Sequence, residues 1–225
     1  MTMSVLHRAY IYQFLSLAFF YPQKELLEEL EEGLHDLSLS FKTLQMQVDL
    51  EPFKKAIAEA KERVIDLQGE WNALFSTTLK APANETAYEL EKAGRKAVEL
   101  ADIEGFYKAF GLEVKSPYEP DSIVAELEFT AFLLRGKMWA EQQGNAEAQE
   151  VYENAFRSFF RDHLGRWYRI FTDLLKEHSE ENYYRHLGEL LKSFLDKERE
   201  GIEGIVDLKE YRKEVLEGVS WKCGT

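Results

Sequence analysis

Carboxylate and aromatic side chains stand close together at the end of one predicted helix and at the start of the next. The motif EWNALF places Trp71 and Phe75 one turn apart, next to a glutamate. After a short loop, Glu85 and Tyr88 are three residues apart and therefore lie on one helical face. Because arginine pairs with carboxylates and stacks on aromatic rings, such residues suit a groove for a cationic and apolar chain. Ordinary packing between helices uses the same residue types, and the sequence leaves that alternative open.

A second cluster lies in the motif EPDSIVAELEF, residues 119–129. Asp121 is positioned to cap a helix, and Glu126 and Glu128 fall in its first two turns, where acidic groups complement the helix dipole. Capping accounts for Asp121 but leaves unexplained a glutamate beside a phenylalanine on a largely apolar helix. A buried carboxylate there needs a cationic partner, either Arg135 or a ligand. We therefore assign these three acidic residues to the same groove.

Sequence motifs for catalysis, nucleotide binding and metal binding are missing from the chain. It contains no GxxxxGK or GxGxxG loop, no GxSxG elbow and no HExxH pair. One Glu-x-x-His occurs, at residues 32–35, whereas a di-iron bundle needs two together with further glutamates. The single cysteine, Cys223, can form neither an intrachain disulfide nor a thiolate cage. We therefore expect no enzyme, no catalytic residue, no metal and no cofactor.

The composition describes a compact acidic protein. Hydrophobic residues make up 45% of the 225 residues and aromatic residues 13%, which is enough to form a sizeable core. With 28 Lys and Arg against 41 Asp and Glu, the net charge is -13, which repels nucleic acids and anionic lipid surfaces. This acidity favours a cationic partner or simply maintains solubility. We expect no nucleic-acid partner.

The chain has no segment that we interpret as a membrane span or a signal peptide. The N-terminal apolar run, residues 5–20, is interrupted by polar and charged residues and lacks a small-residue cleavage site. No other run is long and apolar enough to cross a bilayer. Together with the single cysteine, these features predict a cytoplasmic protein without direct membrane insertion.

Helical periodicity extends over most of the sequence, and strand signals are weak. The five prolines fall between periodic segments, as expected when they separate helices. The wide apolar surface of residues 121–143 predicts a central buried helix. Asn145 and Ser179 are expected N-caps. The other expected helices cover an N-terminal segment ending at Pro22, a segment after Pro22, and residues 49–75, 85–110, 145–177, 179–200 and 204–217.

The segment EVKSPYEPD, residues 113–121, contains two prolines and no apolar period. We predict that it is a hinge between an N-terminal helical half, residues 1–112, and a C-terminal half, residues 122–225, which together form one compact unit. The fold class is therefore all-α. Such a hinge would permit helical halves to exchange between two chains, so monomer and homodimer both remain open.

Several motifs occur in an order that resembles the TorD/DmsD/NarJ family of assembly chaperones for molybdenum oxidoreductases. The resemblance covers roughly residues 5–175 and departs from the family pattern at Ser122, where members commonly have histidine. The similar motifs are the spacing of Arg8, Tyr12, Leu15, Phe19 and Pro22, EWNALF followed by PANETAY, GFYKAFGLEV followed by EPDSIVAELEF, and the pattern of His163, Leu164, Trp167 and Phe171.

The resemblance implies a TorD-like multi-helical bundle that binds the N-terminal or twin-arginine signal segment of an apo molybdenum oxidoreductase subunit. It implies that the chain holds this client until its cofactor is inserted and before export. A generic helical adaptor without such a client is the main alternative, and an enzyme for a small molecule is a third. The residues that we expect to contact the client are Trp71, Phe75, Glu85, Tyr88, Asp121, Glu126 and Glu128.

Overall fold

The computed structural model describes residues 2–88, 95–115 and 117–208. Within these ranges the chain forms nine α-helices, one short 3-10 helix and no strand, which confirms the all-α class. The elements are α1 (Thr2–Ala18), α2 (Lys24–Thr43), α3 (Glu51–Glu62), α4 (Val64–Phe75), η1 (Glu85–Tyr88), α5 (Arg95–Ala109), α6 (Ile123–Gln142), α7 (Ala146–Asp162), α8 (Leu164–His178) and α9 (Asn182–Arg199).

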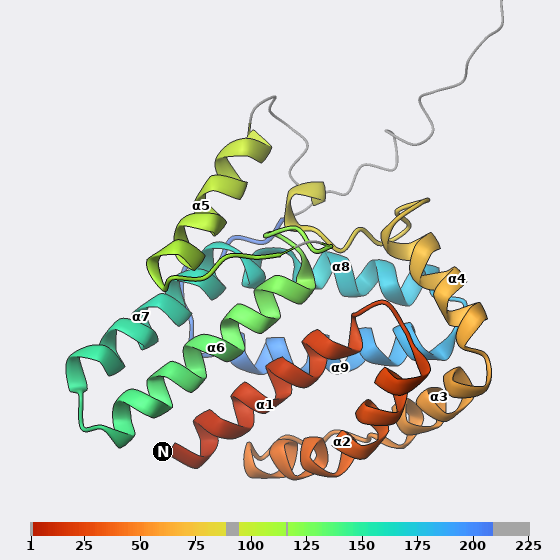
Figure 1. The fold of residues 1–225 in the computed structure, drawn as a ribbon, viewed down its shortest axis with the longest axis horizontal. Helices are drawn as coiled ribbons and strands as arrows, with labels where there is room; N and C mark the ends of the chain where they lie inside the picture. The colour runs from red at the N-terminus through yellow and green to blue at the C-terminus, as the bar shows by residue number, and fades with distance from the viewer. Residues whose placement is uncertain (1, 89–94, 116, 209–225) are drawn as a thin grey trace, which may run out of the picture.

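Helices α1 and α6 run side by side through the middle of the molecule and form its most extensive helix pair (Figure 1). Both are buried over much of their circumference, so the predicted central helix is confirmed as α6. Ile11 and Leu15 of α1 and Leu127 and Leu134 of α6 are all fully buried. Close packing of these apolar residues is the main source of stability in this layer.

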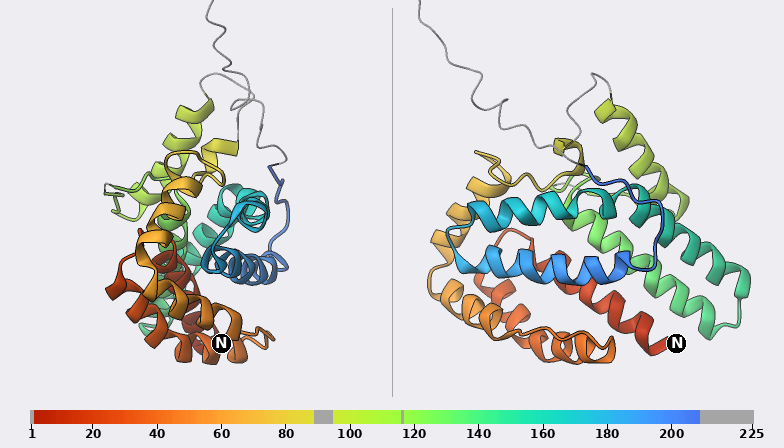
Figure 2. Two further views of the ribbon diagram at one scale, coloured as in Figure 1. Left: turned by 90° about the vertical axis from the view of Figure 1, so that its right-hand side faces the viewer. Right: turned by 180° about the vertical axis from the view of Figure 1, so that it is seen from behind.

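Elements from the two ends of the chain pack against each other. Helix α3 contacts α9, and α8 and α9 lie beside each other on the face opposite α6 (Figure 2). Arg8 donates to both carboxylate oxygens of Glu198 at 2.7 to 3.1 Å, and Tyr12 donates to the same carboxylate at 3.0 Å. The Arg8 guanidinium also lies over the Phe156 ring, 4.8 Å from its centroid. The first helix is thus fastened to the last one, while the division at residues 113–121 remains a prediction.

Two expected long helices are each broken into two. Residues 51–75 form α3 and α4, which meet at Arg63 with ψ at 40°, and residues 146–178 form α7 and α8, which meet at His163 with ψ at -96°. Neither corner residue is proline or glycine, so the residue at the corner does not itself signal the break. Asn145 caps α7 as expected, by accepting from Ala148 N at 3.0 Å. Ser179, expected as an N-cap, instead ends α8.

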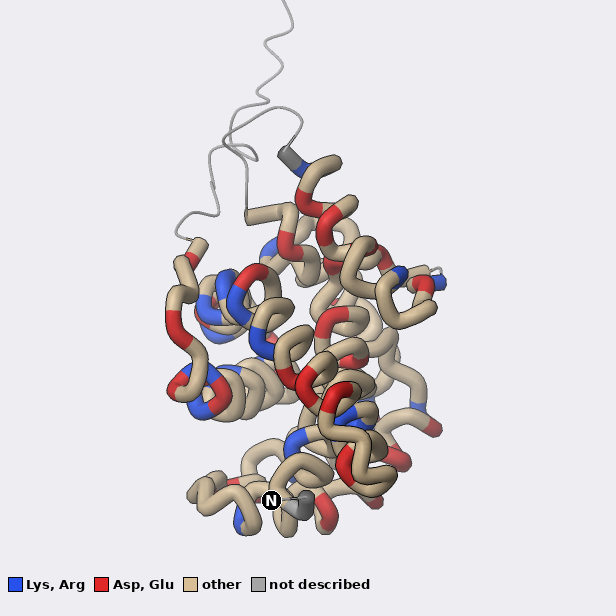
Figure 3. Tube along the Cα trace, turned by 90° about the vertical axis from the view of Figure 1, so that its left-hand side faces the viewer, with Lys and Arg blue, Asp and Glu red and all other residues tan. Residues whose placement is uncertain are grey.

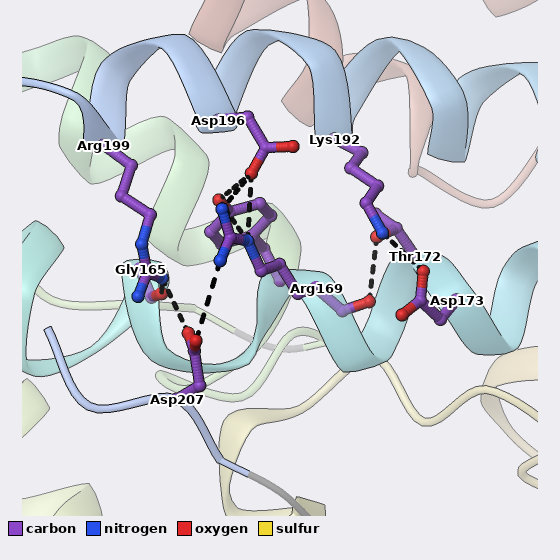
Figure 4. A network of polar contacts seen from close by, with 9 residues as sticks. Gly165, Arg169, Thr172, Asp173, Lys192, Asp196, Arg199 and Asp207 are labelled. Carbon is purple, nitrogen blue, oxygen red and sulfur yellow. Dashed lines mark hydrogen bonds and ion pairs between the residues drawn. The ribbon is translucent and has the colours of Figure 1, made fainter.

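The last described residues form an extended strap along α8 and α9 rather than the helix expected at residues 204–217. Asp207 accepts from Arg199 at 2.6 Å and lies 3.7 Å from Arg169 (Figure 4). The amide of Leu208 donates to Arg166 O at 2.8 Å. Gly204 has φ at +81°, which is outside helical geometry. Residues 209–217 of that expected helix, and Cys223, lie outside the described residues.

Charged positions are interspersed rather than segregated in the view of Figure 3, where Lys and Arg alternate with Asp and Glu along the helices. Many of them pair across short distances, for example Lys137 with Glu153 and Lys192 with Asp173. None of the helices in the described ranges combines the length and the apolarity that a bilayer-crossing segment requires.

The corner between α7 and α8 depends on Gly165, because a Cβ there would lie 2.4 Å from the backbone oxygen of Phe160. We expect Gly165→Ala to lower the free energy of unfolding by about 1–3 kcal/mol through overpacking. Gly69→Ala in α4 is the matched control, because nothing lies within 4 Å of the place that its new methyl group would take. It should raise stability by up to about 1 kcal/mol from helix propensity alone. Urea denaturation measures the free energy of unfolding of both variants. Equal changes in Gly165→Ala and Gly69→Ala would contradict the steric explanation.

Candidate functional site

The two acidic and aromatic clusters predicted from the sequence meet in space. An isolated antiparallel bridge joins Asn84 to Ser122. The amide of Glu85 donates to Asp121 O at 2.9 Å, and the amide of Ile123 donates to Ala83 O at 2.8 Å. This loop pair, residues 83–86 with residues 121–123, brings the start of η1 against the start of α6.

Asp121 fastens the loop pair from inside. Its side chain is buried and accepts from Asn84 Nδ2 at 2.9 Å, from Thr86 N at 3.1 Å and from Thr86 Oγ1 at 2.6 Å. The expectation that Asp121 caps α6 is wrong, because Ser122 is the cap and its Oγ accepts from Ala125 N at 3.2 Å. Serine is a favourable N-cap residue, so Ser122, which stands where the similar family commonly has histidine, has a structural role as the cap of α6.

Glu85 lies in a buried polar network behind the loop pair. One of its oxygens is 3.1 Å from His163 Nδ1, and the other is 3.4 Å from Arg166 Nη1. Burial raises the pKa of Glu85, while His163 and Arg166 act in the opposite direction. Next to it, Tyr88 donates to Pro82 O at 2.6 Å.

Glu126, like Glu85, is completely buried. One oxygen accepts from Trp167 Nε1 at 3.0 Å, and the other has no hydrogen-bond partner among the described residues. Burial raises its pKa well above the ordinary value, and the nearby Glu85 acts in the same direction. The group is therefore neutral under mildly acidic conditions and needs no cationic partner. Glu128, in contrast, is exposed, and Arg135 donates to Gln13 at 2.9 Å.

Two adjoining pockets open on the outer side of the loop pair, and they share Tyr118 and Val124 in their walls. We call them together the linker groove. The first, of about 360 Å³, lies beside α4 and includes Phe19, Tyr21, Trp71, Phe75, Asn84, Pro117, Glu119 and Ser122. The second, of about 380 Å³, lies beside α6 and includes Tyr107, Leu112, Glu113, Lys115, Glu128, Phe129, Phe132 and Arg135.

Tyr118 separates the two pockets and ties the predicted hinge to the end of α1. Its ring stacks on Phe20 with 5.1 Å between centroids, and its hydroxyl accepts from the amide of Tyr21 at 3.3 Å. Trp71 closes the same end, because its Nε1 donates to Phe19 O at 3.1 Å. The predicted hinge segment is therefore one wall of the groove.

The predicted contact residues fall into two groups. Trp71, Phe75 and Glu128 line the linker groove, whereas Glu85, Tyr88, Asp121 and Glu126 are buried behind it with at most 3% of their surface exposed. The sequence did not single out Tyr118 or Arg166, and it gave His163 and Trp167 only as part of the family resemblance, not as site residues. Their four-residue spacing at the start of α8 is visible in the sequence, but the acidic residues facing them, Glu85 and Glu126, are identified only by the fold. Client contact by the buried group remains a prediction that requires the loop pair to open.

Glu126 gives a pH-dependent prediction. The unfolded group loses its proton near its ordinary pKa of 4.5, whereas the folded group retains it, so wild-type stability falls as pH rises toward the folded pKa. Glu126→Gln removes this titration. We expect its stability relative to wild type to increase as pH rises from the ordinary pKa of 4.5 toward the raised pKa of the folded state, by up to about 1.4 kcal/mol per pH unit.

Urea unfolding at several pH values measures this difference, and Glu128→Gln, an exposed change on the same helix, is the control. The pKa of Glu126 is influenced by the hydrogen bond from Trp167 and by three charged groups, Glu85, Asp121 and Arg166. A stability difference that does not change with pH would contradict a neutral buried Glu126.

Comparison with known proteins supplies an independent identification. A scan against protein-family models matches the nitrate reductase delta subunit family over residues 24–173, which is two thirds of the chain and includes α2 to α7 and most of α8. No match is found among curated proteins. The matched range includes residues of the loop pair, of the buried polar network and of the linker groove. The chain belongs to the nitrate reductase delta subunit family, a TorD-like family of chaperones for molybdoenzyme assembly.

Proposed function

We propose that the chain is a cytoplasmic chaperone that binds the N-terminal or twin-arginine signal segment of an apo molybdenum oxidoreductase subunit. It holds this segment in the linker groove while the cofactor is inserted and before the client is exported. The observation that supports this proposal is the groove itself, which joins an aromatic pocket to a second pocket with charged groups in its wall. A peptide with cationic residues next to an apolar run matches both parts.

Aromatic rings in the pocket beside α4 provide the apolar part of the binding energy. Trp71 stands edge-on to Tyr21 and to Phe75, with ring centroids 5.2 and 5.8 Å away. Only part of the Trp71 side chain is buried, so apolar client side chains would cover the rest. Each buried square ångström of apolar surface contributes about 25 cal/mol, which makes a ring of this size an expected hot spot.

Carboxylates at the groove supply the contacts for cationic client residues. Glu119 belongs to the pocket beside α4 and Glu128 to the pocket beside α6, and both are exposed. Lys115 and Arg135 also line the second pocket, so the groove is not uniformly acidic. Arginine recognition therefore depends on individual carboxylates rather than on the total charge, and the net charge of -13 adds mainly to the association rate.

The buried residues keep the groove in shape. Asp121 and Glu85 hold residues 83–86, and Asn84 and Ser122 from the loop pair line the groove directly. Removing the Asp121 carboxylate would leave donors of Thr86 and Asn84 without their acceptor and would loosen one wall. Variants at Asp121 thus change binding and folding together, and exposed groove residues give the cleaner test.

We expect a labelled peptide with an Arg-Arg-x-Phe-Leu core to bind Trp71→Ala at least roughly 30-fold more weakly than wild type, as for a hot-spot aromatic. Glu128→Gln should weaken binding roughly twofold to fivefold, and the loss should shrink as salt is added. Fluorescence anisotropy measures both. Glu150→Gln, an exposed change on α7, is the matched control.

Equal affinities across these variants would remove the linker groove from client binding. If the peptide fails to bind wild type and affinity purification recovers only partners unrelated to molybdoenzymes, the chain acts as a general helical adaptor instead. Recovery of an apo-oxidoreductase subunit supports the proposal.

A further inference from the structure

A second feature of the interior is unrelated to peptide binding. The imidazole of His163 lies between two carboxylates, with Nδ1 at 3.1 Å from Glu85 and Nε2 at 3.3 Å from Asp102. Nε2 is buried and has no hydrogen-bond partner of suitable geometry among the described residues. A neutral imidazole donates one hydrogen bond and accepts the other, so it cannot satisfy two carboxylates.

Glu99 completes this cluster. Oxygen atoms of Glu85 and Glu99 and a ring nitrogen of His163 all lie within 4.8 Å of one another. These residues come from η1, from α5 and from the corner between α7 and α8, so the fold itself assembles them. Ligand atoms around a tetrahedral zinc ion are separated by roughly 3.4 Å, so small side-chain movements would close the cluster around an ion.

We propose that Glu85, Glu99 and His163 form a binding site for a divalent transition-metal ion. Asp102 lies 3.3 Å from Nε2 of His163, a position from which carboxylates commonly orient metal-bound histidines. One imidazole with two carboxylates suits Zn²⁺, Mn²⁺ or Fe²⁺. The ion would bind one ring nitrogen of His163 and one oxygen each of Glu85 and Glu99.

Arg166 is the one cationic group that the described residues place against both glutamates. Its Nη1 is 3.4 Å from Glu85 and 3.8 Å from Glu99, both longer than the roughly 2.8 Å of a strong charge-assisted hydrogen bond. At these distances it offsets part of the charge of the two carboxylates. It remains next to the ion and limits the affinity.

The ion would connect α5 to the rest of the molecule. Among the described residues, α5 packs against α7 and η1 far less extensively than α1 packs against α6. Glu99 and Asp102 are on α5, and Glu85 is in the loop pair behind the linker groove. Metal binding would therefore fix α5 against the groove wall, which is a stabilising role that requires no catalytic step.

Equilibrium dialysis of the full chain with Zn²⁺, followed by elemental analysis, tests the site. We expect one strongly bound ion per chain and a dissociation constant at least roughly tenfold weaker in Glu99→Gln, with a smaller loss in Asp102→Asn. The Glu99 side chain is 15% exposed and the Asp102 side chain 62% exposed, and neither belongs to the apolar core, so both changes leave that core intact. Glu104→Gln, on the same helix and bonded to Lys108, is the control and should bind like wild type.

Mn²⁺ provides a second readout that locates the ion. At substoichiometric Mn²⁺, the ring-proton NMR signals of His163 should broaden before those of His186, a surface histidine beside Glu189. Equal broadening of all histidines, or equal Zn²⁺ affinity in Glu99→Gln and Glu104→Gln, would overturn the proposal. The absence of Zn²⁺ binding would overturn it as well. The test involves no peptide and is independent of the proposed function.

Discussion

The contact between residues 83–86 and residues 121–123 determines how the rest of the site is arranged. Two backbone hydrogen bonds and the three bonds accepted by Asp121 hold together segments that are separated by more than thirty positions. On one side this loop pair forms the floor of the linker groove, and on the other side it directs Glu85 toward His163 and Arg166. Surface recognition and buried polar chemistry therefore depend on the same few bonds.

The interior polar residues have an energetic cost that explains their arrangement. A buried carboxylate is stable only when it is paired or neutral. Glu85 is paired with His163 and Arg166, and Glu126, whose pKa burial raises well above its ordinary value, accepts from Trp167. Because removing one partner would leave the other buried without compensation, these groups specify one position of η1 relative to α8. An apolar interior would permit several positions at similar energy.

Much of the helical fold is predictable from the sequence because apolar periodicity determines which faces are buried. The central position of α6 follows from its wide apolar surface, and the role of Asn145 as the N-cap of α7 follows from the preference of asparagine for that position. The corners at Arg63 and His163 are not predictable in this way, since neither corner residue is proline or glycine and the close approach of Gly165 to Phe160 O is visible only in the fold. Glu70 shows the same limit, because its carboxylate accepts from the amides of Glu180 and Glu181 in place of a local cap for α9.

The sequence indicated which residue types occur around the linker groove, but not which of them are exposed and which are buried. Trp71, Phe75 and Glu128 line the groove, as a mixed aromatic and acidic pattern indicated. The pattern could not show that Glu85, Asp121 and Glu126 lie inside, because burial depends on which helices cover them. It also could not reveal the cluster of Glu85, Glu99 and His163, whose members are up to 78 residues apart and form no local motif.

The central claim is that the linker groove holds the client segment, and site-specific photo-crosslinking tests it most directly. A photoreactive amino acid at Glu119, in the groove, and one at Val206, exposed on the strap along α8 and α9, are compared with the same apo-oxidoreductase subunit. We expect crosslinks from position 119 to the first residues of the client and few or none from position 206. Equal crosslinking from both positions, or crosslinks from position 206 alone, would contradict the claim.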